Sequence, residues 1–155
     1  MKMPELEFAF RIRIEFPQGT RLRYPVMGEG MRGFVSVLGG TISGPRLQGE
    51  VIAGSGGDWP LFRQDGVACF DARYLLRASD GTIIQIANRG YAHAPPEAQR
   101  RLASGESIEM LDNYCRFTPT FETAAGPHDW LMRTVLIGTG EKYADHSLFD
   151  YFIVR

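Results

Sequence analysis

The feature that most limits the fold is a strict alternation of apolar and polar residues near the start of the chain. Successive side chains of a β-strand point to opposite faces, so this pattern predicts a half-buried strand. The core face would carry Leu6, Phe8, Phe10, Ile12, Ile14 and Phe16, and the other face Glu7, Arg11, Arg13 and Glu15.

The rest of the chain continues in short strand-like runs separated by glycine and proline. We expect strands over Phe34–Leu38, Thr41–Ser43, Leu47–Ile52, Val67–Ala78, Thr82–Arg89, Tyr114–Phe121, Thr134–Glu141 and Leu148–Val154. Asp80 and Gly81 are typical of a tight hairpin turn. Thr20–Gly33 contains so many breakers that it is predicted to be a long loop. One short helix is expected, at Pro95–Ala103, lying across the mouth of the barrel.

Many short strands and one helix predict a mainly β protein. An up-and-down antiparallel barrel of lipocalin-like shape avoids the exposed edges of a flat sheet. With 155 residues, 44% of them hydrophobic, the chain can bury one substantial core, so we expect residues 1–155 to form a single domain.

The charge balance narrows the choice of partners. A net charge of -1 gives no general attraction to nucleic acid or an anionic membrane, and no segment resembles a membrane span or a signal peptide. Cys69 and Cys115 are not a disulfide framework, and reduced cysteines favour a cytoplasmic protein. The aromatic strand Phe149–Ile153 fits either a core or a contact in a homo-oligomer.

Several segments resemble a known family. GGTISGPRLQGEVIAGSGGDW (Gly39–Trp59), FDARYLLRASDGTIIQIANRG (Phe70–Gly90), RFTPTFET (Arg116–Thr123) and WLMRTVLIGTGE (Trp130–Glu141) are similar to the domain of unknown function 3237 family, uncharacterised protein family 0311. The resemblance runs from about Phe34 onward and implies a β-barrel, but little about chemistry. Family positions correspond here to Gly57, Asp58, Trp59, Asp71, Arg73, Asp80, Gly81, Asn88, Arg89, Gly90, His93, Pro119, Phe121, Glu122, Trp130 and Thr134. Met132 departs from the asparagine usual in the family, so a ligand held by that amide in relatives would be held differently here.

Two carboxylates are candidates for acid–base chemistry. Asp58 and Trp59 follow a glycine-rich loop that can bring them to a cavity mouth; the alternative is a turn cap and a core indole. Glu122 lines the barrel interior only if Phe117 and Phe121 point outward; otherwise it is a surface glutamate paired with a base such as Arg116. A carboxylate in an apolar interior has a raised pKa and suits proton transfer.

Polar residues on the predicted hairpin are candidates for ligand binding. Asp71 and Arg73 share one strand face, and Asn88 and Arg89 end the paired strand, where they would suit an anionic oxygen. A solvated strand face would look the same in sequence. His93 is either a general acid on a loop or a turn residue.

The three histidines lack the spacing of a metal site, and no phosphate loop or nucleophile motif occurs, so no metal and no cofactor are expected. We therefore expect a small-molecule ligand between Trp59, Arg73, Asn88, Glu122 and Trp130. The hypothesis is a cofactor-independent isomerase, lyase or cyclase that moves a proton on a hydrophobic or aromatic metabolite. The alternative is a binding protein that holds such a metabolite unchanged.

Overall fold

The computed structural model describes residues 2–17, 22–28, 30–103, 113–143 and 145–155. The strands of the first half are β1 (Leu6–Glu15), β2 (Leu22–Pro25), β3 (Met31–Ser36), β4 (Gly39–Ser43), β5 (Gly49–Val51), β6 (Gly57–Asp58) and β7 (Leu61–Phe62). Those of the second half are β8 (Ala68–Ala78), β9 (Ile83–His93), β10 (Tyr114–Thr123), β11 (Leu136–Lys142) and β12 (His146–Val154). The helices are α1 (Pro96–Ala103) and the 3-10 helix η2 (Asp129–Met132). Within the described residues, neither has the length and apolarity needed to cross a membrane.

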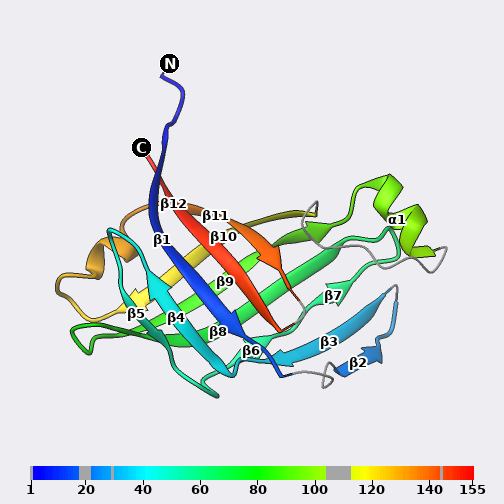
Figure 1. Cartoon of the computed structure of the whole chain (residues 1–155), viewed down its shortest axis with the longest axis horizontal. Helices are drawn as coiled ribbons and strands as arrows, with labels where there is room; N and C mark the ends of the chain where they lie inside the picture. Colours follow the sequence, from blue (N-terminus) through cyan, green and yellow to red (C-terminus); the bar gives the residue numbers. More distant parts are fainter. Residues whose placement is uncertain (1, 18–21, 29, 104–112, 144) are drawn as a thin grey trace.

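The strands close into the antiparallel barrel that the sequence predicts (Figure 1). The ring of eight strands runs β8, β5, β4, β1, β12, β11, β10 and β9, and β9 pairs back onto β8. Strands β6 and β7 pair with β8 on the same edge as β5, nearer the start of β8. Strand β3 pairs with both β6 and β7. Apart from β2, β3, β6 and β7, which lie outside the ring, ring neighbours follow one another along the chain, which makes this an up-and-down barrel.

One expected loop is largely a hairpin. Residues 22–25 and 31–36 form β2 and β3, paired from Leu22–Phe34 to Pro25–Met31, whereas Thr20, Arg21 and Glu29 lie outside the described residues. The glycines of this segment are compatible with a hairpin. Gly28 and Gly30 lie between β2 and β3 with φ of 100° and 117°, which glycine adopts readily. Gly33 lies in β3, close against Pro60.

A β-bulge in β1 changes which of its residues face the core. Phe8 pairs with Phe152 and Phe10 with Tyr151, so Ala9 is an extra residue and the alternation shifts by one. Ala9 and Phe10 are both fully buried, while Leu6 and Phe8 are 56% and 40% exposed. The prediction that all six apolar residues share the core face is therefore wrong for Leu6 and Phe8.

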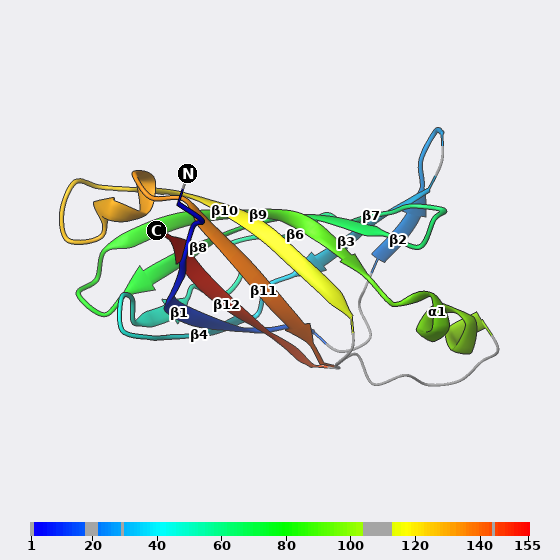
Figure 2. The ribbon, with the colours of Figure 1, turned by 90° about the horizontal axis from the view of Figure 1, so that it is seen from above.

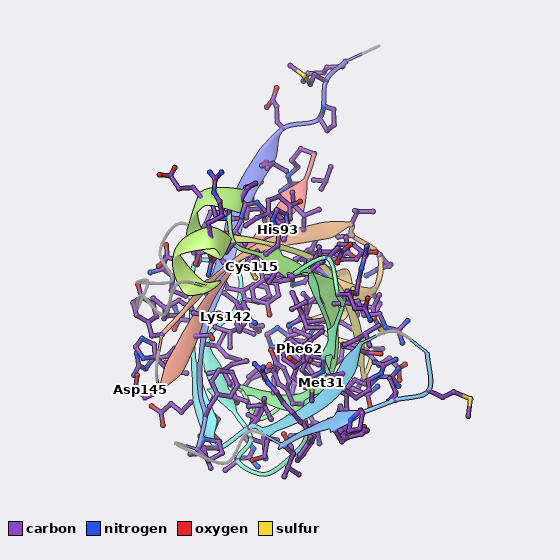
Figure 3. The ribbon with its side chains drawn as sticks, turned by 90° about the vertical axis from the view of Figure 1, so that its right-hand side faces the viewer. Met31, Phe62, His93, Cys115, Lys142 and Asp145 are labelled. Atoms are coloured by element: carbon purple, nitrogen blue, oxygen red, sulfur yellow. The ribbon has the colours of Figure 1, made fainter. Side chains whose placement is uncertain are left out.

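Side chains fill one end of the barrel and leave the other open. Leu136 pairs with Ile153 near the C-terminal end of β12, and it is buried, as are Leu131 of η2 and the core residues Phe10, Ile84 and Tyr151. Both chain termini lie at this end of the barrel (Figure 1). Helix α1 lies at the opposite end, beyond the end of β9 (Figure 2). It stands at the rim of the mouth rather than across it (Figure 3). The predicted Phe149–Ile153 strand contributes Phe149, Tyr151 and Ile153 to the core.

Candidate functional site

The open end holds a cavity of about 500 Å³, the size of a small-molecule site. Its walls are mainly apolar and include Val35, Phe62, Phe70, Ala72 and Phe149. Figure 3 looks into this mouth. Because strand side chains alternate, only every second residue of each strand reaches the cavity.

Asp58 is the one carboxylate that lines this cavity among the described residues. It pairs with Val35 of β3 on one side and with Ala72 of β8 on the other, and all three side chains face inward. Its Oδ1 accepts a hydrogen bond from the Asp71 backbone N–H at 3.0 Å. Burial raises the pKa of Asp58 above its ordinary value, an effect that the Lys142 ammonium opposes.

Lys142 enters the cavity from the opposite wall. Strands β8, β9 and β10 lie between β6 and β11 in the hydrogen-bonded order, and the alternation Gly138, Gly140, Lys142 turns this side chain inward. Its Nζ lies 5.5 Å from the centre of the Phe70 ring. Among the described residues Lys142 forms no direct ion pair, so its charge faces the cavity without a carboxylate in contact.

A polar network lies at the inner end of the cavity. Asn88 Nδ2 donates to the hydroxyl oxygens of Tyr74 at 3.1 Å and Tyr151 at 2.8 Å. Burial raises the pKa of both tyrosines, so their hydroxyls stay protonated at neutral pH. Asn88 Oδ1 is buried and has no partner among the described residues. This network fixes the barrel interior below the cavity and places Asn88 and Tyr74 on its lining.

Two further polar side chains lie on the wall nearest α1. His93 lines the cavity and stacks on Tyr114, with ring centres 4.8 Å apart. Cys115 is buried, which raises the pKa of its thiol and keeps it protonated. Its setting does not favour a nucleophilic thiolate.

Three predicted residues lie on the outer face of the barrel. Phe117 and Phe121 are buried, so the even-numbered side chains of β10 point outward, and Glu122 is one of these exposed residues. The lumen position considered for Glu122 is therefore not the one it occupies. Arg73 and Arg89 are also exposed, and both approach Asp71 Oδ1, at 3.6 and 3.2 Å.

The two tryptophans lie away from the cavity lining. Trp59 follows the inward Asp58 and so points outward, where it is 42% exposed and packs on Phe34 with ring centres 5.1 Å apart. Trp130 belongs to η2 at the filled end, packs against the core, and has the Arg46 guanidinium 5.0 Å from its ring centre. Of the predicted site residues, the structure brings together Asp58, Asn88 and His93.

Sequence reasoning missed Lys142 and Tyr74. The strand was expected to end at Glu141, one residue short of Lys142, although the Gly138–Gly140 alternation continues to it. Tyr74 follows Arg73 along β8 and faces the barrel interior, on the strand face opposite to the predicted Asp71 and Arg73. No group of three His, Cys, Asp or Glu side chains suited to a metal ion occurs in the described part of the chain.

A closed barrel with a ligand-sized cavity at one end defines the class of protein. The family model described as "Protein of unknown function (DUF3237)" matches residues 4–154, and the chain belongs to this family. A UPF0311 protein of Rhodopseudomonas palustris is 29% identical over 147 residues, 95% of each chain.

Solved structures share the fold. A β-barrel like protein from Acinetobacter baumannii is 26% identical with a TM-score of 0.87, covering 100% of this chain and 98% of that one. An enzyme from Penicillium herquei is more distant, at 22% identity and a TM-score of 0.71, covering 100% of this chain and 97% of that one. At that identity the likeness concerns the fold alone.

Proposed function

We propose that this protein binds a small, mainly apolar metabolite in the mouth cavity and that Asp58 transfers a proton on it. The observation that carries the proposal is the Asp58 carboxylate inside an apolar cavity of about 500 Å³, with its pKa raised by burial. A carboxylate freed from part of its hydration is a stronger base toward a bound substrate, and a pKa nearer neutrality suits an acid–base catalyst.

The chemistry would run between the two facing walls. The ionised Asp58 takes a proton from a carbon or oxygen acid of the substrate, and negative charge develops on a substrate oxygen. The Lys142 ammonium, on the opposite wall, stabilises that charge, the part that the sequence analysis had given to an arginine or to Asn88. Return of the proton at another position gives isomerisation, departure of a leaving group gives elimination, and internal attack gives cyclisation.

The apolar walls also favour a second function, that of a carrier. A binding protein needs apolar area and a few orienting polar groups, and the wall residues Val35, Phe62 and Phe149 supply the first. A carrier, however, has no need of a carboxylate whose pKa is raised by burial within its cavity. Asp58 therefore favours catalysis over storage.

The test uses a probe reaction that needs only a base. Ring opening of 5-nitrobenzisoxazole begins with proton abstraction from carbon and releases a coloured phenolate. The wild-type protein should accelerate it, and Asp58→Asn should lose about 100-fold or more of that acceleration. Glu122→Gln, which removes an exposed carboxylate of the outer face, is the matched control and should react like wild type.

Two results would count against catalysis. Equal rates for wild type and Asp58→Asn would show that Asp58 is not the base. Saturable binding of the probe in the cavity with no acceleration would favour the carrier.

A further inference from the structure

Lys142 places a positive charge in a cavity whose walls are mainly apolar. Lys142 is half-buried at the end of β11, with its Nζ 5.5 Å from the centre of the Phe70 ring. A cation in such surroundings loses hydration, and an oxygen anion at contact distance restores the lost interaction. Asp58 does not supply that contact: no ion pair joins the two side chains, although the Lys142 charge lowers the pKa of Asp58.

The other two basic side chains on the described lining of the cavity are differently placed. The Arg23 guanidinium stacks on the Phe62 ring at 4.2 Å, on the opposite side of the mouth, where Arg23 is exposed. His93 is stacked on Tyr114. Among the described residues that line the cavity, Lys142 is thus the cation that combines partial burial with a position facing Asp58.

We infer that the ligand of this cavity carries an anionic oxygen, a carboxylate or a phenolate, which pairs with Lys142 while its apolar body fills the cavity. This rests on the proposed function for its orientation: the anionic end lies at Lys142, and the reacting C–H or O–H lies at Asp58 on the opposite wall. The Ala72 side chain beside Asp58 is small and leaves room for the ligand body there.

Isosteric probes of one ring system test the inference. Binding of 2-naphthoate and of the neutral 2-naphthamide would be measured by calorimetry on the intact protein. Wild type should bind the carboxylate roughly tenfold or more tightly than the amide, the advantage expected of a charge-assisted contact. Lys142→Met should abolish this preference and leave amide binding nearly unchanged.

Arg89→Met is the matched control, because it removes a cation from the outer face of the barrel and should keep the preference. A naphtholate that is ionised at neutral pH, 2,4-dinitro-1-naphtholate, serves as the second source of an anionic oxygen. Preference for the carboxylate alone, or for the naphtholate alone, identifies which oxygen the site takes. Equal affinity for charged and neutral probes in wild type would overturn the inference.

The same titration separates this inference from the proposed function. Asp58→Asn removes a negative charge from the cavity, so it should bind 2-naphthoate more tightly than wild type does. If the carboxylate preference holds while Asp58→Asn leaves the benzisoxazole rate unchanged, the anion site stands and the catalytic proposal fails. If the rate depends on Asp58 but Lys142→Met does not change the carboxylate preference, the catalytic proposal stands and the anion site at Lys142 fails.

Discussion

Asp58 and Lys142 enter the same cavity from opposite walls of the barrel, and the charge of one acts on the protonation of the other. Burial raises the pKa of Asp58, and the Lys142 ammonium lowers it again in part. The pair therefore sets the pH at which Asp58 becomes a base.

A first prediction concerns the pH dependence of proton abstraction. The rate of 5-nitrobenzisoxazole opening should rise with pH as Asp58 ionises, around its raised pKa. Lys142→Met removes the cation that lowers the pKa of Asp58, so that pKa should rise further and the rate profile should shift to higher pH. Arg89→Met should leave the profile where it is, and an unshifted profile in Lys142→Met would contradict the electrostatic coupling.

A second prediction concerns stability, measured by urea unfolding across a pH series. Because the folded-state pKa of Asp58 is raised above its unfolded value, its contribution to stability is fully present below the unfolded pKa. That contribution is lost as pH rises through the folded pKa. Asp58→Asn should abolish this loss and be more stable than wild type at neutral pH. Glu122→Gln should follow the wild-type curve of stability against pH. An Asp58→Asn curve parallel to wild type would show that ionisation of Asp58 does not lower the stability of the folded protein.

A third prediction concerns the polar network below the cavity. Tyr74→Phe removes a hydroxyl that accepts from Asn88 Nδ2 and leaves that buried N–H without its partner. The free energy of unfolding should fall by about 1–3 kcal/mol. Tyr91→Phe alters a tyrosine that is 55% exposed and should change stability little. Equal stability of the two variants would argue against the network.

A fourth prediction concerns the packing of Phe117, which contacts the cavity-wall rings of Phe70 and Phe149. Gly138 lies against the Phe117 ring, and a methyl group added there overlaps ring atoms. Gly138→Ala should cost about 1–3 kcal/mol of unfolding free energy through overpacking, measured by urea denaturation. Thr139→Ala, on the next residue of β11 and facing outward, should cost much less.

Sequence pattern predicted the barrel well because alternation reports which side of a strand is buried. It failed where the alternation itself shifts: nothing near Ala9 signals the bulge, which lies close against Gly44 of another chain segment. The β2–β3 hairpin was missed because glycines that break an isolated strand are accommodated by tertiary contacts such as that of Gly33 with Pro60.

The candidate site was predictable only in part. Asp58 stood out because it follows a glycine-rich loop, whereas Glu122 could be placed only by knowing whether the phenylalanines beside it face in or out. The burial of Phe117 and Phe121 decides that question. Lys142 belongs to a distant strand, and only closure of the ring brings it opposite Asp58.

The most direct measurement is a crystal structure of the protein with 5-nitrobenzotriazole, an unreactive analogue of the probe whose acidic N–H can pair with a carboxylate. The account predicts density for the ring in the mouth cavity, with a nitrogen in hydrogen-bond contact with Asp58 and the ligand body extending toward Lys142. Density on the outer face beside Arg73 and Glu122, with the cavity holding only water, would contradict it.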